Sequence, residues 1–285
     1  MMIRDTRLGV ITWTMYGSFC STDSEEETEE ETASGSNDDG MRSPSRAEEL
    51  MVRPEDIWQK QPRGAERESC HSEDVVYVKI EGIIAGGKST LINDIRDKYR
   101  DDPRVLCVNE PVHKFLNHHD FNCLRILEES PYTQAGIIQA CMIHILSHFY
   151  KSILANKSAD VKIIILDRYI TSSEIFIKCL RASGYITYFN EIVLLEILRD
   201  YMSELPKPSM IFYLDRDVDW SMKHIKERSR EGEQNFCDHS YLSNLKSQMN
   251  IFLDNTPIPV VSTSETDKKS LNKQLSDIID KLLKP

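Results

Sequence analysis

The clearest chemical pattern in the sequence is a glycine-rich stretch that begins at Gly82. It reads Gly-Ile-Ile-Ala-Gly-Gly-Lys-Ser and has the spacing G-x-x-x-x-G-K-[ST], with Lys88 and Ser89 at its end. Glycines at these positions let backbone N–H groups wrap a phosphate chain, the lysine adds charge beside the outer phosphates, and the hydroxyl ligates Mg²⁺. The residues predicted to bind a nucleotide are Gly82, Ile83, Ile84, Ala85, Gly86, Gly87, Lys88, Ser89 and Thr90.

Two acidic residues stand where apolar runs end. Glu110 closes the run at 104–109 and precedes Pro111, and a carboxylate in that position can accept the proton of an attacking hydroxyl. Asp167 follows the apolar residues 163–166, where nucleoside-triphosphate enzymes hold a Mg²⁺-ordering carboxylate, so Ser89 and Asp167 are the predicted metal ligands. Arg168 comes next and is suited to holding phosphoryl oxygens. A solvated acid or an ion pair at the sheet rim is the simpler alternative for each position.

A third group of charges lies in the stretch Lys-Glu-Arg-Ser-Arg-Glu-Gly-Glu at 226–233. Arg228 and Arg230 are two residues apart and Gly232 follows, which is typical of a mobile lid whose arginines meet a transferring phosphoryl group on closure. Most charge runs of this kind are only the solvated face of a helix, so the pattern is weak by itself.

The elements that must position these residues alternate along the chain. Apolar, β-branched runs at 75–82, 104–111, 161–168, 209–216 and 258–264 predict strands covered on both faces. Amphipathic segments at 88–99, 132–155, 172–181, 189–204, 218–229, 238–254 and 267–283 predict helices. This order predicts an α/β P-loop kinase fold with a five-stranded parallel sheet, flanking helices and a helical lid. Ligands of such sheets bind at the carboxyl ends of the strands.

Charge divides the chain near residue 75. Residues 1–75 contain 18 Asp and Glu against 8 Lys and Arg, and the whole chain carries a net charge of −11, so residues 76–285 are close to neutral. We therefore expect a disordered acidic leader at 1–74 and a folded kinase domain at 75–285. A near-neutral domain offers no basic surface for duplex nucleic acid, so no nucleic-acid partner is expected.

Cysteine usage and hydropathy bear on the compartment. The 7 cysteines are scattered without a C-x-x-C pair, which favours reduced thiols in the cytoplasm or nucleus. The leader lacks a convincing secretory signal, and no stretch approaches the roughly 18 apolar residues that would span a bilayer. We therefore expect a cytoplasmic or nuclear protein that is not secreted and not bound to a membrane.

Taken together, residues 75–285 resemble the deoxynucleoside kinases, a family that includes cellular deoxynucleoside kinases and herpesvirus-type thymidine kinases. The family pattern is E-G-x-x-x-x-G-K-[ST], E-P, a Gln on a long helix, [DE]-R and a lid with R-x-R. The matching positions are Glu81 to Ser89, Glu110-Pro111, Gln139, Asp167-Arg168 and Arg228-x-Arg230, in the same order and at similar spacing.

The resemblance implies roles in phosphotransfer from ATP with Mg²⁺. Glu110 would accept the proton of a nucleoside 5′-hydroxyl, Asp167 would order the metal ion, and Arg168 would hold the 5′-oxygen and the γ-phosphoryl group. Arg228 and Arg230 would act from the lid. The function implied is ATP-dependent phosphorylation of a deoxynucleoside in nucleotide salvage, and a homodimer is expected.

The resemblance also implies a substrate pocket, made by Phe115, Gln139, Met142, Leu146, Ser173 and Glu233. Gln139 would pair with the base edge and Glu233 would approach the sugar 3′-hydroxyl. Family members that accept cytidine or purines carry an Arg and an Asp where this chain has Leu146 and Ser173, which favours thymidine. For the sugar contact, Glu128 and Tyr132 stay open as alternatives.

Two other functions remain open. The sequence Asp-Arg-Tyr followed by Ser172 and Ser173 also resembles thymidylate kinases, but these supply an Arg near the end of the second strand, and residues 107–114 contain none. A non-catalytic nucleotide-binding regulatory protein is the alternative of another class. That alternative does not need Glu110, Asp167 and the paired lid arginines.

Overall fold

The computed structural model describes residues 75–284, and the predicted leader at 1–74 lies outside the described residues. Five parallel strands form one sheet in the order β2-β3-β1-β4-β5. The strands are β1 (Val76–Gly82), β2 (Val105–Val108), β3 (Ile163–Asp167), β4 (Met210–Leu214) and β5 (Val260–Thr263). All five predicted strands are present, each somewhat shorter than its apolar run, which confirms the predicted α/β architecture.

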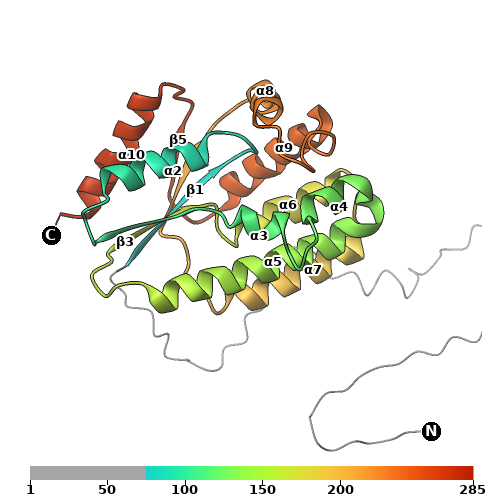
Figure 1. The fold of residues 1–285 in the computed structure, drawn as a ribbon, viewed down its shortest axis with the longest axis horizontal. Coiled ribbons are helices and arrows are strands. Elements are labelled where there is room, and N and C mark those ends of the chain that lie inside the picture. The colour runs from blue at the N-terminus through green and yellow to red at the C-terminus, as the bar shows by residue number, and fades with distance from the viewer. Residues whose placement is uncertain (1–74, 285) are drawn as a thin grey trace, which may run out of the picture. The chain divides into compact units, whose positions relative to one another are not determined.

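Helices cover both faces of this sheet. They are α2 (Lys88–Lys98), α3 (Val112–Leu116), α4 (Cys123–Glu129), α5 (Pro131–Asn156), α6 (Ser172–Ala182), α7 (Tyr188–Met202), α8 (Val218–Arg228), α9 (His239–Asn255) and α10 (Lys268–Leu282). Figure 1 shows α2 and α10 on one side of the strands and α5, α6 and α7 on the other. The seven predicted helices are therefore present, and α3 and α4 were not predicted.

Alternation along β1 divides its side chains between the two faces, because successive residues of a strand point to opposite sides. Val78 and Ile80 are buried against α2 and α10, in a core that includes Ile92 and Leu275. Tyr77 belongs to the larger core on the other face, which α5, α6, α7 and α9 complete. The two cores fix the sheet between its helical layers.

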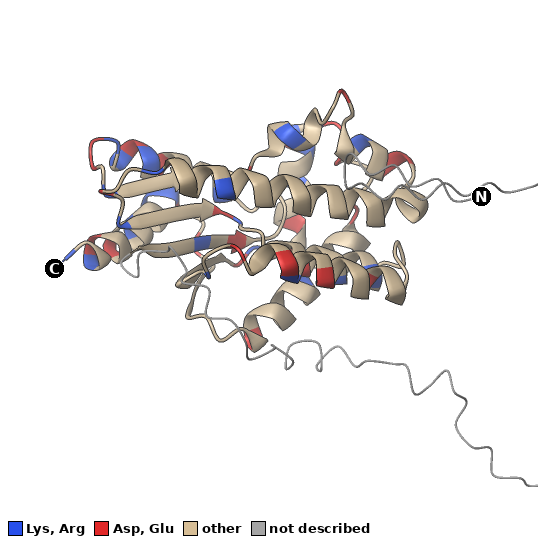
Figure 2. Cartoon of the chain, turned by 90° about the horizontal axis from the view of Figure 1, so that it is seen from below, with Lys and Arg blue, Asp and Glu red and all other residues tan. Residues whose placement is uncertain are grey.

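Parallel pairing brings the carboxyl ends of the central strands to one edge. Ile80 of β1 lies beside Asp167 of β3, and Gly82 of β1 lies beside Leu214 of β4. Residues that follow these strands therefore converge, although they are distant in sequence. In the view of Figure 2, basic and acidic segments are interspersed along the described helices, in keeping with the near-neutral charge of this part of the chain.

The long helix α5 differs from expectation in one respect. By length and composition its 26 residues are apolar enough to cross a membrane, whereas no such stretch was expected from the sequence. Its apolar character has an explanation within the fold, since Ala135, Ile138, Ile143 and Ile145 are buried in the larger core. The helix thus serves as a core element that runs along one face of the sheet.

Candidate active site

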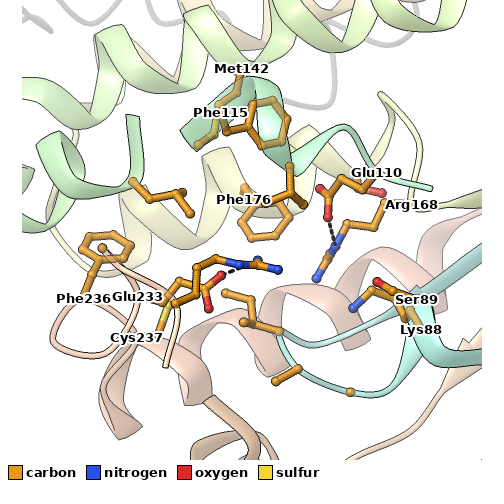
Figure 3. Close-up of a pocket in the computed structure, with 18 of the residues that line it drawn as sticks. Lys88, Ser89, Glu110, Phe115, Met142, Arg168, Phe176, Glu233, Phe236 and Cys237 are labelled. Carbon is orange, nitrogen blue, oxygen red and sulfur yellow. Dashed lines mark hydrogen bonds and ion pairs between the residues drawn. The ribbon is translucent and has the colours of Figure 1, made fainter. Parts of the chain in front are cut away.

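A cavity of about 590 Å³ opens where the ends of β1, β2 and β3 converge. Its wall includes Lys88 and Ser89 after β1, Glu110 after β2 and Arg168 after β3. Figure 3 shows these four polar side chains at one end of the cavity and the rings of Phe115 and Phe176 beyond them. The volume is within the range of small-molecule sites.

Glycine shapes the loop between β1 and α2. At Gly82, with φ of 156°, an added Cβ would lie 2.9 Å from the carbonyl oxygen of Leu214, so no larger residue fits against β4. Gly87 has φ of 91° and directly precedes the first turn of α2, a conformation that glycine adopts without strain. The loop can therefore present backbone N–H groups to a phosphate chain at the start of a helix.

Lys88 is held by this loop through neutral partners. Its Nζ donates to the carbonyl oxygens of Gly82 (3.0 Å) and Ile83 (2.8 Å). Burial, together with the nearby Arg168 guanidinium, lowers the pKa of Lys88 to about 8. The ammonium is thus placed at the floor of the loop, beside the position that outer phosphates take in this motif.

Ser89 and Asp167 lie next to each other as the sequence predicts. The Ser89 hydroxyl donates to Asp167 Oδ2 at 2.5 Å, and the Asp167 side chain is only 1% exposed. The second carboxylate oxygen, Oδ1, is buried without a hydrogen-bond partner among the described residues. A hydroxyl and a carboxylate with one unsatisfied oxygen are hard oxygen donors that suit Mg²⁺, so the residues present fit that ion.

Arg168 connects two carboxylates. Its backbone has φ of 63°, its Nη1 donates to Glu81 Oε1 at 3.0 Å, and its Nε lies 3.8 Å from Glu110 Oε2. Glu81 is fully buried, and its Oε2 also binds Lys79 and accepts a hydrogen bond from Ser172. Burial alone would raise the pKa of Glu81, but Lys79 and Arg168 lower it to about 2. Glu81 is therefore a fixed anion behind Arg168.

Glu110 has a different environment from Glu81. Its side chain is 24% exposed at the cavity wall, and burial raises its pKa while the Arg168 guanidinium acts in the opposite direction. A carboxylate with a raised pKa is a stronger proton acceptor than an ordinary glutamate. Figure 3 shows Glu110 and Arg168 facing each other across the polar end of the cavity.

The other end of the cavity is largely apolar. It is lined by Phe115 and by Gln139, Met142 and Leu146 of α5, with Ser173 on α6, so the structure brings together these five predicted pocket residues. Gln139 is 6% exposed, which places one buried amide among apolar side chains. An amide can donate and accept hydrogen bonds at once, as recognition of a base edge requires.

Several lining residues were not predicted from the sequence. Phe176 lies under the Arg168 guanidinium, with the Arg168 Cζ atom 4.8 Å from the centroid of the Phe176 ring. Phe176 follows Ser173 by one helical turn, so the sequence spacing could have indicated that both residues face the same side of α6. Leu124 and Leu127 belong to α4, which was itself not predicted. Further lining side chains come from Leu180, Phe236, Cys237 and Tyr241.

The predicted lid forms a compact ionic group. Arg228 Nη2 and Arg230 Nη1 donate to the two carboxylate oxygens of Glu233, at 2.5 and 2.7 Å. The arginines and Glu233 line the cavity, as expected, but here they pair with one another. Gly232 has φ of 81°, and a Cβ there would lie 2.5 Å from the backbone N of Arg125, so the lid lies directly on α4.

The remaining predicted positions are close to the cavity or outside its wall. Residues 84–90 line the cavity. Gly82 and Ile83 do not line it but accept hydrogen bonds from Lys88, and Asp167 is connected to the cavity wall through its hydrogen bond with Ser89. Of the two alternatives for the sugar contact, Glu128 accepts a hydrogen bond from the Asn235 backbone, and Tyr132 is 74% exposed against Tyr185. Neither lies in the described cavity wall.

Comparisons with known proteins agree with this geometry. The family model of deoxynucleoside kinases matches residues 78–284. A thymidylate kinase of Fervidobacterium nodosum is 26% identical over 158 residues, covering 55% of this chain and 74% of that protein. A probable thymidylate kinase of Pyrobaculum aerophilum is 28% identical over 188 residues, covering 63% of this chain and 82% of that protein.

The fold has a counterpart among solved structures. The structure of a deoxyadenosine kinase from M. mycoides, with the products dCMP and dCDP bound, superimposes with a TM-score of 0.59. It is 18% identical and covers 72% of this chain and 100% of that one, which shows a shared P-loop kinase fold. Because the family match extends over nearly all of the described residues, the chain belongs to the deoxynucleoside kinase family and is a nucleoside phosphotransferase.

Proposed function

We propose that this kinase transfers the γ-phosphoryl group of ATP to the 5′-hydroxyl of thymidine, as a step in nucleotide salvage. The observation that supports this most is the distribution of charge in the cavity wall. Its lysine and arginine side chains are Lys88 at the phosphate loop, Arg168 at the end of β3, and Arg228 and Arg230 on the lid. The opposite end presents apolar side chains and the Gln139 amide, which suits an uncharged nucleoside.

The base pocket favours thymine. Gln139 would pair with the base edge, while Leu146 and Ser173 leave room for a methyl group without presenting a buried charge. One methyl group in an apolar pocket is worth only about 1–3 kcal/mol. We therefore expect a preference for thymidine over other deoxynucleosides rather than their exclusion.

The polar residues have complementary tasks in this proposal. Glu110 accepts the proton of the 5′-hydroxyl, Arg168 holds the oxygen and the incoming phosphoryl group, and Lys88 binds the outer phosphates. When bound at Ser89 and Asp167, Mg²⁺ would neutralise charge on the phosphates. Arg228 and Arg230 approach from the lid once they exchange Glu233 for phosphoryl oxygens.

Thymidylate kinase is the second candidate, favoured by the two thymidylate kinase relatives. Its acceptor already carries a phosphate and needs a fixed cation near the end of β2. The segment 107–114 contains no Arg, and besides His113 its basic residue is Lys114. The Lys114 Nζ lies over the ring of Phe149, 5.7 Å from the ring centroid, and Lys114 does not line the cavity. The arrangement therefore favours the nucleoside.

The deciding experiment measures ATP consumption with thymidine, deoxycytidine, deoxyadenosine, deoxyguanosine and thymidine monophosphate as acceptors. We expect thymidine to give the highest kcat/KM. Turnover of thymidine monophosphate without turnover of any nucleoside would replace our assignment by thymidylate kinase. ATP binding without transfer to any acceptor would favour a regulatory protein.

Two sets of variants test the residues that carry the proposal. Glu110→Gln keeps the shape of the side chain but removes the base, so kcat should fall roughly 10²-fold or more. Glu196→Gln, an exposed change on α7, is the matched control. Leu146→Arg combined with Ser173→Asp should move the preference toward deoxycytidine.

The homodimer and the cytoplasmic or nuclear compartment expected from the sequence stay predictions. Light scattering coupled to size-exclusion chromatography measures the first, and microscopy of the tagged full chain measures the second.

A further inference from the structure

A lysine lies in the middle of the central strand β1 with none of its surface exposed. Lys79 stands between Val78 and Ile80, and its side chain is completely buried. Lysine is almost never fully buried unless it is paired, because the ammonium loses its hydration. Burial accordingly lowers the pKa of Lys79, against the opposing effect of Glu81. Such a residue needs a structural or chemical reason for its position.

The contacts of Lys79 all lie on the sheet face that points toward α6 and α9. Its Nζ is 2.8 Å from Glu81 Oε2 and 3.1 Å from the hydroxyl of Thr171, and it lies 4.8 Å from the ring centroid of Phe252. Lys79 and Glu81 are two positions apart on one strand, so their side chains share that face. The ammonium therefore has one anionic partner within hydrogen-bond distance.

Glu81 divides its two oxygens between two cations. Oε2 binds Lys79 and accepts a hydrogen bond from Ser172 at 2.6 Å, while Oε1 accepts from Arg168 at 3.0 Å. Arg168 in turn lies 3.8 Å from Glu110. The four charged side chains thus alternate in sign from the interior of the sheet to the cavity wall.

We propose that Lys79 is a positioning residue for phosphotransfer, which binds Glu81 from the interior so that Glu81 orients Arg168 without neutralising it. With Lys79 present, the charge of Glu81 is shared by two cations. Without it, Arg168 would be the sole cation in contact with that carboxylate, in an environment where opposite charges attract strongly. The guanidinium would then be drawn inward and away from Glu110. This inference rests on the proposed roles of Arg168 and Glu110.

Other charged or titratable groups face this cluster from every neighbouring element. Glu174 of α6 acts on Lys79, and its carboxylate is paired with Lys178. Tyr213 of β4 lies beside Glu81 in the sheet register, and its hydroxyl accepts from Lys246. Asp167 precedes Arg168 on β3. Tyr150 of α5 faces Glu81 and Glu110, and its buried hydroxyl has no hydrogen-bond partner among the described residues. Glu174 and Tyr213 have partners of their own and the Tyr150 phenol is neutral, so the change at Lys79 should act mainly through Glu81.

The test uses Lys79→Met in the full-length kinase, which removes the charge and keeps an unbranched chain. We expect kcat to fall at least about tenfold, equivalent to ~1.4 kcal/mol, with a smaller change in KM for thymidine. An opposite charge nearby lowers a carboxyl pKa, so withdrawing Arg168 from Glu110 should move the acid limb of the kcat–pH profile upward by about one unit. A purely structural role would lower the melting temperature without moving this limb.

Lys79→Gln is the second variant, and it retains a hydrogen-bond donor without the charge. It should show the same fall in kcat and the same shift of the acid limb. Lys151→Met, which removes the ion pair between α5 and Glu204, is the matched control and should leave the profile unchanged. Wild-type kcat and an unmoved acid limb in either folded variant would overturn the proposal.

The remaining outcomes are also decisive. If circular dichroism shows that both variants fail to fold, Lys79 serves folding and the positioning role is wrong. If the unaltered kinase phosphorylates thymidine monophosphate and no nucleoside, the proposed function fails, and the same variants then test the inference about Lys79 with that acceptor. A defect in both variants within an active wild-type background supports the inference.

Discussion

Two glutamates in this molecule each bind two cations, yet their surroundings differ. Glu81 lies inside the sheet, fully buried, with the buried side chains of Lys79 and Arg168 as partners. Glu233 lies on the lid and its own side chain is also buried, at 8% exposed, but its partners Arg228 and Arg230 remain 33% and 26% exposed. The first group is held by strands and the second by a loop after α8. The same pairing chemistry therefore occurs once inside the scaffold and once on an element suited to move.

The difference in water access determines what each group can do. Separating Glu81 from its cations leaves uncompensated charges in a poorly polarisable interior, whereas the lid arginines already reach water and can be hydrated at little cost when they leave Glu233. Glu81 can therefore fix the direction of Arg168. In the proposed function, Arg228 and Arg230 exchange Glu233 for a phosphoryl group and return to it after transfer.

The largest expected effect comes from Lys88→Ala, which tests the phosphate loop near the buried group. The ammonium stabilises developing charge on the phosphoryl group, so its loss should lower kcat by about 10³-fold or more, or several kcal/mol. Its hydrogen-bond partners are the neutral carbonyls of Gly82 and Ile83, so thermal stability should change little. Near-normal turnover would contradict the assigned role.

Next in size is Glu81→Gln, which should destabilise the fold by about 3–5 kcal/mol because it leaves two buried cations without their carboxylate. Urea unfolding monitored by circular dichroism measures the change. The matched variant at the second glutamate is Glu233→Gln. If Glu81→Gln lowered the unfolding free energy by less than about 1 kcal/mol, the difference in burial would not distinguish the Glu81 group from the Glu233 group energetically.

Acid should weaken the buried group around Glu81. The pKa of Glu81 is lowered from 4.5 to about 2 in the folded chain, so its contribution to stability is fully present above pH 4.5 and is lost as pH falls toward 2. The integrated effect is of order 3 kcal/mol, partly offset by the burial of the Lys79 ammonium. Unfolding free energies measured between pH 7 and pH 3 should fall less steeply in Glu81→Gln than in the wild type.

A smaller effect is expected for Glu233→Gln. Its arginine partners reach water, so the unfolding free energy should change by less than about 1 kcal/mol. The family resemblance implies a contact between Glu233 and the sugar 3′-hydroxyl. Glu233→Gln should therefore raise KM for thymidine but leave KM for thymidine lacking that hydroxyl unchanged. Equal changes in KM for the two nucleosides would remove Glu233 from the sugar site.

The smallest effect is expected from deleting residues 1–70, which carry most of the net negative charge of the chain. Their composition predicts no packing against the kinase domain, so kcat/KM and the melting temperature should stay close to those of the full chain. A loss of kcat/KM greater than about tenfold, roughly 1.4 kcal/mol, would show that the leader contributes to the site.

The residues at strand ends were predictable because parallel strands bring their carboxyl ends together. Gly82, Glu110 and Asp167 each follow a readable apolar run, and their convergence follows from the fold alone. The helices α3 and α4 were not predictable from the sequence, because 5 and 7 residues are too few to show a helical period. A weak signal for α4 exists in Asn122, whose side chain caps the helix by accepting from Leu124 and Arg125.

The two ionic groups were unequally visible in the sequence. Lys79 lies within an apolar strand, two positions from its carboxylate partner Glu81. Thr171, which accepts a hydrogen bond from Lys79, and Arg168, which binds Glu81, are about ninety positions away, so no local pattern relates the whole group. Glu233 is close to its arginines in sequence, but the pairing competes with the substrate contact implied by the family resemblance. Sequence spacing alone does not decide between those partners.

The close contact of Gly232 with the backbone of α4 affects how substrate binding and lid movement are related during turnover. The lid that carries Arg228 and Arg230 rests on the same helix from which Leu124 and Leu127 line the cavity. A displacement of α4 to admit a nucleoside would therefore disturb the lid as well. We therefore expect binding of the nucleoside and binding of ATP to be kinetically linked. Release of the products should then depend on the same movement of α4 and the lid.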